Sequence, residues 1–185
     1  MVIAVKKDEK IMVGSSICDG CTQMTDKDLV LDENIPFWKP KNTKNCYVFA
    51  EDACLETDLL RYNDEIFKGV CDFDSIIANV IPKMQALLRR YYLISEEKSW
   101  GSQLLIIING TMVTIDHYFV ATKCKNFVSL GADYVMCGAI EEMQDASLEE
   151  RMIFAVKTTE QAFNKRLFPM VIRDMQTKKR KVVFN

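Results

Sequence analysis

Residues 2–16, with the sequence VIAVKKDEKIMVGSS, contain the pattern that decides the fold of this chain. Two short apolar runs, residues 2–5 and 11–14, are separated by the polar residues 6–10. Apolar runs on either side of a polar break are typical of a β-hairpin. The chain is therefore predicted to open with two antiparallel strands.

Further strands and helices follow in groups. Apolar runs predict strands at residues 29–31, 46–49, 103–108, 112–115, 118–122, 127–130, 170–173 and 181–184. Apolar residues at three-and-four spacing predict helices at 53–67, 75–93, 132–143 and 147–165. Asn109-Gly110 indicates a tight hairpin within a meander of four strands over residues 103–130. Ser147 and Glu150 form a capping box, and Pro82 is expected to kink its helix.

This grouping predicts the fold class. Strands that come in groups, with each pair of helices returning over a sheet, favour an α+β protein. We expect a four-layer αββα sandwich, in which two antiparallel sheets lie between the helix pairs. The predicted helices 53–67 and 75–93 form one outer layer, and the helices 132–143 and 147–165 form the other.

Composition sets the class of protein. The 185 residues are 49% hydrophobic and 27% charged, which excludes a disordered chain. This length suits a single domain, residues 1–185, since no Gly/Ser/Pro-rich linker divides it. With 24 basic and 26 acidic residues the net charge is −2, and the pI is 5.6. Bulk nucleic-acid binding, which usually needs a basic domain, is not expected.

Membrane insertion and export are not expected either. The longest strong apolar run, residues 104–108, is far shorter than the ~20 residues of a membrane-spanning helix. The apolar start of the chain is also too short for a signal peptide. Seven scattered cysteines, at positions 18, 21, 46, 54, 71, 124 and 137, are then most simply reduced thiols. A cytoplasmic protein is predicted, in which the sequon at Asn109 is only a turn.

Three stretches resemble one known family, the proteasome β-type subunits and the bacterial peptidase HslV. The stretch 2–16 resembles their first hairpin, and CYVFAEDACLETDLLRYNDEIF (46–67) resembles a later strand and helix. The stretch NFVSLGADYVMCGAIEEMQDASLEERMIFAVKTTEQAF (126–163) resembles a strand, a glycine turn and two helices. The resemblance covers most of the chain and implies the αββα fold of N-terminal-nucleophile hydrolases. It also implies an oligomer built through the helical faces.

The activity of that family requires an N-terminal threonine, whose hydroxyl attacks while its own amine serves as base. The resemblance places Met1 on the family's second residue, so that nothing stands at the nucleophile. Removal of Met1 would expose Val2, which has no nucleophilic atom. Cleavage before Thr22 or Thr25 would delete the hairpin that has to hold the nucleophile.

The other catalytic positions are also changed. The resemblance places Ser15 or Ser16 on the family's aspartate, and Ala132 on its later serine. The lysine that activates the nucleophile falls on Phe37 or Trp38, with Lys39 two residues away. The glycine that binds the oxyanion falls on Glu51 or Asp52, where a carboxylate would repel the developing charge. We therefore assign no catalytic residue, no cofactor and no metal to this chain.

Two local motifs have a functional and a structural interpretation. Cys18 and Cys21 form a CxxC pair, which can bind metal or exchange disulfides. The chain has no second CxxC and only one histidine, so we interpret the pair as two thiols in a loop. The carboxylates of Glu51, Asp52, Glu56 and Asp58 could bind a cation. We interpret them instead as first-turn residues of a helix, where negative charge is favourable.

Two further features are interpreted in the same way. His117, next to Asp116, could act as a general base, but a single histidine without a nucleophile makes no mechanism. The basic run 178–181 could bind phosphate or an acidic partner. We interpret it as a solvated turn beside an edge strand that its charge protects.

These observations leave three hypotheses. The first is a proteasome/HslV-like subunit with a degenerate active site, which forms homo-oligomers or acts through interactions. The second is a threonine-type peptidase or amidase whose mature N-terminus differs from Met1. The third is a module for a small ligand, lined by Ser15, Glu51 and Asp52. No partner ATPase is assigned. The helix 75–93, with Leu87, Leu88, Tyr91 and Tyr92, is predicted to present an excess apolar face.

Overall fold

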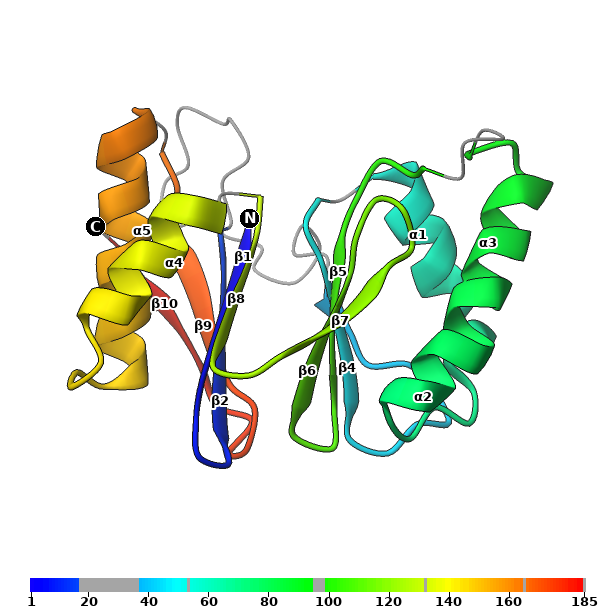
Figure 1. Ribbon diagram of the computed structural model, residues 1–185, viewed down its shortest axis with the longest axis horizontal. Coiled ribbons are helices and arrows are strands. Elements are labelled where there is room, and N and C mark those ends of the chain that lie inside the picture. The colour runs from blue at the N-terminus through cyan, green and yellow to red at the C-terminus, as the bar shows by residue number, and fades with distance from the viewer. Residues whose placement is uncertain (17–36, 53, 95–98, 132, 165, 185) are drawn as a thin grey trace. The chain divides into compact units, whose positions relative to one another are not determined.

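The computed structural model describes residues 1–16, 37–52, 54–94, 99–131, 133–164 and 166–184. The chain divides into two compact units, each with an antiparallel sheet that has helices on one face (Figure 1). Unit 1 comprises Met1–Ile35 and Asn126–Asn185, and unit 2 comprises Pro36–Lys125. The predicted strand 29–31 lies outside the described residues.

Unit 1 is built on the N-terminal hairpin. In its sheet the strand order is β10-β9-β2-β1-β8. The strands are β1 (Val2–Lys7), β2 (Lys10–Ser16), β8 (Phe127–Leu130), β9 (Met170–Asp174) and β10 (Arg180–Val183). Val2 pairs with Ser15 on one side and with Leu130 on the other. The first hairpin is therefore the centre of the sheet, and segments from the C-terminal part of the chain complete both sides.

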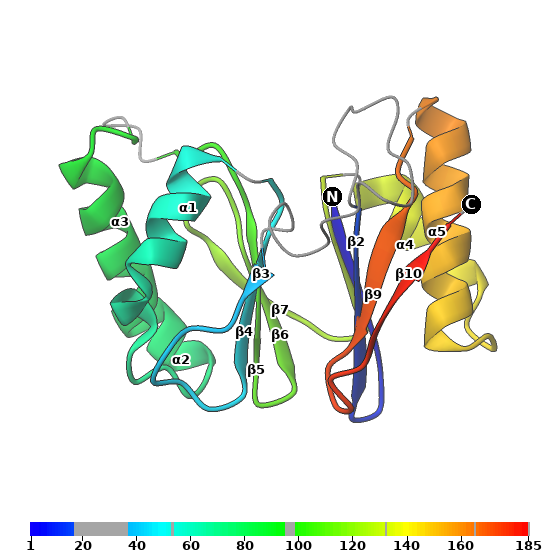
Figure 2. The same cartoon turned by 180° about the vertical axis from the view of Figure 1, so that it is seen from behind.

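Two regular helices, α4 (Asp133–Glu142) and α5 (Leu148–Phe163), cover one face of this sheet (Figure 2). The predicted capping box starts α5, because Ser147 Oγ accepts from the N–H of Glu150 at 3.3 Å and Glu150 Oε2 accepts from the N–H of Ser147 at 2.9 Å. The core between helices and sheet is rich in methionine. Its methionines are Met12, Met136, Met152 and Met170.

Unit 2 has the sheet order β3-β4-β5-β6-β7. Its strands are β3 (Phe37–Trp38), β4 (Cys46–Ala50), β5 (Leu104–Ile108), β6 (Thr111–Ile115) and β7 (Ala121–Cys124). The predicted hairpin at Asn109-Gly110 is confirmed, since Ile108 pairs with Thr111 and both turn residues have positive φ. β5 is buried along its whole length, which fits its uninterrupted apolar sequence.

The helical layer of unit 2 is irregular. It consists of α1 (Leu55–Tyr62), the 3₁₀ turn η1 (Asp64–Phe67), α2 (Phe73–Ser75), the π-helical turn η2 (Ile76–Val80) and α3 (Ile81–Arg90). Pro82 lies in the first turn of α3, directly after the π turn, in which the N–H of Ile81 bonds to Ile76 O. Proline has no N–H to donate to the preceding turn, so the irregularity of the helix coincides with Pro82.

The predicted fold class is confirmed as α+β, with two antiparallel sheets and the helices assigned as expected. Three details of the prediction are wrong. Phe37–Trp38 is a short strand where none was predicted. β8 pairs with β1 rather than continuing the meander of β5, β6 and β7. The strand expected at 118–122 begins only at Ala121, because residues 116–120 form a turn.

Candidate functional site

One end of the unit 1 sheet holds the positions that the family resemblance assigns to the N-terminal residues and to the aspartate. The N–H of Ser16 donates to Met1 O at 3.2 Å, and Val2 pairs with both Ser15 and Leu130. Met1, Ser15 and Ser16 therefore lie close to the end of β8, which precedes Gly131. Ala132, Thr22 and Thr25 lie outside the described residues.

The serines at this end lack the charge of the aspartate that the family has there. Ser15 is buried and neutral, on the sheet face opposite the methionine core. A hydroxyl can orient a neighbour by a hydrogen bond, but it supplies no negative charge to hold a cation or an ammonium group. The side chains of Met1, Ser15 and Ser16 therefore place no negative charge at this end of the sheet.

In unit 2, β3 is an aromatic strand. The ring of Phe37 lies 4.7 Å from that of Phe49, and the ring of Trp38 meets Phe67 edge-on at 6.1 Å. Lys39 is exposed, and its ammonium lies 5.9 Å from the centre of the Tyr47 ring. The positions assigned to the activating lysine are thus filled by rings that stabilise the sheet.

Glu51 follows β4 directly and is half-buried. Its N–H donates to Gln103 O at 2.9 Å, which extends the pairing of β4 with β5 by one residue. An oxyanion site needs a backbone N–H that points at the reacting atom and has no other acceptor. The N–H of Glu51 is already used in the sheet, so this residue offers neither the donor nor a neutral surface.

Only two of the four acidic residues after β4 are first-turn residues of α1, as the structural interpretation expected, whereas Glu51 and Asp52 precede the helix. Cys54 is the N-cap, and Glu56 and Asp58 lie in the first turn. Thr57 Oγ1 accepts from the N–H of Cys54 at 2.9 Å and lies 3.0 Å from Asp52 O. Within the described residues no group of three His, Cys, Asp or Glu side chains is arranged to hold a metal ion.

His117 has a hydrogen-bond partner at each ring nitrogen. Nδ1 lies 3.2 Å from Trp100 O, which can only accept, so Nδ1 carries the proton. Nε2 then accepts from the amide Nε2 of Gln103 at 3.0 Å. The ring joins the start of β5 to the turn after β6, and both of its nitrogens make hydrogen bonds within unit 2.

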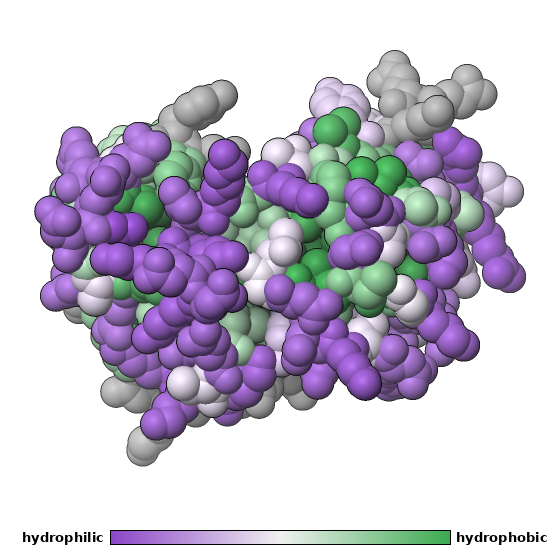
Figure 3. Space-filling view, turned by 60° about the horizontal axis from the view of Figure 1, so that its bottom comes forward, coloured by the Kyte–Doolittle hydropathy of each residue, from purple (hydrophilic) through white to green (hydrophobic). Residues whose placement is uncertain are grey.

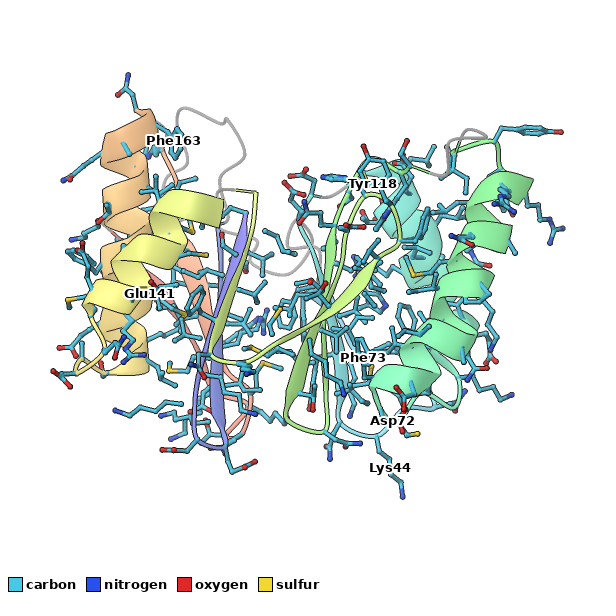
Figure 4. The ribbon with its side chains drawn as sticks, viewed as in Figure 1. Lys44, Asp72, Phe73, Tyr118, Glu141 and Phe163 are labelled. Atoms are coloured by element: carbon cyan, nitrogen blue, oxygen red, sulfur yellow. The ribbon has the colours of Figure 1, made fainter. Side chains whose placement is uncertain are left out.

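Other contacts fix the same turn. The indole N–H of Trp100 donates to Asp116 O at 2.8 Å, and Asp116 Oδ1 accepts from the N–H groups of Tyr118 and Val120 at 2.9 Å. Figure 4 shows Tyr118 at this end of unit 2, with Asp72 and Phe73 at the opposite end. No local pattern predicts the contact of Gln103 with His117, because the two residues are 14 positions apart.

Three of the described cysteines have thiols that burial makes less acidic. Burial raises the pKa of Cys46 to about 12, and burial also raises the pKa of Cys54 and of Cys124. A thiol with a raised pKa stays protonated at neutral pH and reacts poorly. Cys18 and Cys21, the residues of the CxxC pair, lie outside the described residues.

Comparison with solved structures gives the fold a name. The protein BPH of Thiobacillus denitrificans, solved in complex with epoxomicin, matches with a TM-score of 0.66 and 14% identity, over 99% of this chain and 97% of that chain. HslV from Trypanosoma brucei matches with a TM-score of 0.60 and 8% identity, over 94% and 97%. Anbu, an ancestral beta-subunit from Yersinia bercovieri, matches with a TM-score of 0.61 and 10% identity, over 100% and 87%.

The chain therefore has the proteasome β-subunit/HslV-like fold, which is an N-terminal-nucleophile hydrolase fold. At identities of 8–14% the similarity concerns the fold alone. No protein-family model and no curated protein sequence matches the chain. Among the described residues, no helix combines the length and the apolar character needed to cross a membrane.

Proposed function

We propose that this chain is a proteasome/HslV-like subunit without the catalytic constellation, which forms homo-oligomers or binds partner proteins rather than hydrolysing peptides. The observation that carries the proposal is the position of the Glu51 carboxylate together with the hydrogen bond of the Glu51 N–H. Its carboxylate stands at a position that the resemblance assigns to the oxyanion glycine, and its N–H is bonded to Gln103 O. A preorganised donor there would contribute about 3–4 kcal/mol to catalysis.

Two other positions support the proposal independently. Phe37 and Trp38 pack against other rings at the place of the activating lysine, and Ser15 and Ser16 stand at the place of the aspartate. Members of a catalytic set act as a unit, so the loss of several leaves little activity to be recovered by restoring one. We propose that residues 1–185 form a single domain, because the solved BPH chain matches 99% of this chain.

Exposed aromatic side chains support an oligomer. Tyr91 and Tyr92, which follow α3, are 51% and 94% exposed. Leu88 and Leu87, which were expected to share this apolar face, belong instead to the core or pack against it. The excess apolar surface is therefore smaller than the sequence predicts, and it is concentrated on the two tyrosines. Tyrosine is enriched in protein interfaces because it adds contact area with few rotatable bonds.

One preparation of the full chain tests both parts of the proposal. Fluorogenic peptides are offered to it, epoxomicin is added, and the intact mass is measured, with Thiobacillus denitrificans BPH as the positive control for epoxomicin. We expect no turnover and no adduct. Turnover that epoxomicin abolishes by labelling the first residue would support the alternative, a threonine-type peptidase or amidase with a different mature N-terminus.

Light scattering on the same preparation tests the oligomer. We expect a multiple of the 21.3 kDa chain mass at micromolar concentration. The double variant Tyr91→Ser/Tyr92→Ser should lower that mass, while Tyr62→Ser, which changes an exposed tyrosine on α1, should leave it unchanged. A monomer at micromolar concentration would contradict the oligomer. The proposed cytoplasmic location fits the five described cysteines, none of which is in a disulfide.

A further inference from the structure

Two turns at one end of the unit 1 sheet, far apart in sequence, lie side by side (Figures 1 and 2). One joins β1 to β2, and the other joins β9 to β10. The side-chain amide of Gln176 donates to Glu9 O at 2.9 Å, and the N–H of Met175 donates to Ile11 O at 3.0 Å. Lys10 lies 3.6 Å from Asp174. These contacts join two lysine-rich segments into one surface.

We call this surface the basic end. It consists of Lys6, Lys7, Lys10, Arg173, Lys178, Lys179, Arg180 and Lys181. The same two segments, residues 6–10 and 173–181, contain three acidic residues, so their net charge is +5. The whole chain carries −2, so all other residues together carry −7. Even with Glu149 of α5, which pairs with Lys181, the surface keeps a charge of +4. Such an asymmetry points to an interaction surface.

The basic end is exposed, and hydrogen bonds hold its second turn. Lys7, Lys10 and residues 178–181 are exposed, and Figure 3 shows hydrophilic side chains gathered over unit 1 when this end is turned forward. The backbone beneath them is fixed, because Asp174 Oδ1 accepts from the N–H groups of Gln176 at 2.9 Å and Thr177 at 3.0 Å. The charges therefore stand on a preformed support, which lowers the entropic cost of binding.

We propose that the basic end docks an acidic segment of a partner protein. Opposite charge gives such a contact its rate and its specificity, and both weaken as salt is added. A nucleic acid fits less well for two reasons. The −7 carried by the other residues would repel a long polyanion more than a short acidic segment. The two turn segments also contain no aromatic side chain on which a base could stack.

The proposal is tested by fluorescence anisotropy on the full chain, with a fluorescein-labelled peptide of alternating Glu and Ser as the probe. We expect saturable binding at low ionic strength that weakens as NaCl is added. The double variant Lys7→Glu/Lys179→Glu should bind roughly tenfold more weakly or not at all. The control Lys44→Glu/Lys83→Glu makes the same change of charge on exposed lysines of unit 2 and should bind as the unmodified chain does.

A third variant, Lys7→Arg/Lys179→Arg, keeps the charge and should keep the affinity. Circular dichroism and a thermal unfolding curve establish that each variant is folded. Equal loss in both Glu variants would assign binding to net charge and would overturn the proposal, as would absence of saturable binding. A single-stranded oligonucleotide of equal length that binds more tightly than the peptide through Lys7 and Lys179 would also overturn it and identify a nucleic-acid surface.

Discussion

In each unit, helices cover one face of an antiparallel sheet, but the helices and the core side chains of the two units differ. Unit 1 uses two regular helices, a capping box at Ser147 and a core rich in methionine. Unit 2 uses short helical segments with a π turn, and its core contains Trp38, Phe67, Trp100 and Phe119. Helix capping is common to both units, because α1 and α2 also begin with capping boxes. The units differ in the regularity of their helices and in the side chains of their cores, which are flexible methionines in unit 1 and large rings in unit 2.

The largest expected effect follows from the aromatic core of unit 2. Phe67 is fully buried at the end of η1 and meets the ring of Trp38 edge-on. Phe67→Ala should lower the free energy of unfolding by about 3–5 kcal/mol, because it removes a large buried ring and leaves a cavity. Urea unfolding measures this loss. The control Tyr62→Ala changes a side chain that is 83% exposed, and it should change the free energy by less than about 0.5 kcal/mol.

A matched change in unit 1 sharpens this prediction. Met152 is fully buried in the methionine core, and Met152→Ala should cost about 2–5 kcal/mol. Hydrogen exchange then distinguishes two cases. If residues 1–185 form one domain, either variant should speed the slowest exchange in both units. Faster exchange confined to the mutated unit would contradict the single domain.

An intermediate effect is expected at the start of α5. Ser147→Ala removes the acceptor for the N–H of Glu150 and should lower the free energy of unfolding by about 1 kcal/mol. Thermal or urea unfolding measures the change, and Ser147→Thr, which keeps the hydroxyl, serves as the control. Stability equal to that of the unmodified chain would mean that packing alone defines the start of this helix.

The smallest effect concerns pH and the turn between β9 and β10. Burial by itself would raise the pKa of Asp174, but the N–H groups of Thr177 and Gln176 and the charge of Lys10 outweigh it and hold the pKa below its ordinary value of 3.8. The ionised carboxylate of Asp174 therefore stabilises the folded state fully above pH 3.8. This stabilisation is lost as the pH falls through the lowered pKa.

Asp174→Asn tests this dependence on pH, because it keeps an oxygen acceptor for the turn but removes the charge. Unfolding curves recorded from neutral to acidic pH should be less steeply pH-dependent in the variant than in the unmodified chain. Addition of salt should reduce the part of this pH-dependent stability that comes from the charge of Lys10, because its ion pair with Asp174 is partly exposed. Identical pH profiles would contradict a stabilising role for this carboxylate.

Much of the fold could be predicted from local patterns. The first hairpin, the turn at Asn109-Gly110 and the capping box at Ser147 each depend on residues close together in sequence, and each is confirmed. The short strand Phe37–Trp38 was missed because two residues give no period, and β4 supplies its pairing. The place of β8 was missed because sequence adjacency to β7 favours a meander, whereas β8 pairs with residues at the other end of the chain.

In the candidate site, too, some features follow from the residues themselves and others depend on contacts between distant parts of the chain. The residue types at the positions of the family resemblance can be read from the sequence, and with them the replacement of charged or small residues by Ser15, Trp38 and Glu51. Three other features emerge only from the folded chain: the N–H of Glu51 bonds to Gln103, His117 holds a turn, and two lysine-rich turns form one basic surface. The physical reason is distance along the chain. Propensity and periodicity act over a few residues. Hydrogen bonds between strands, and the clustering of charged side chains from separate turns, need partners that only the folded chain brings together.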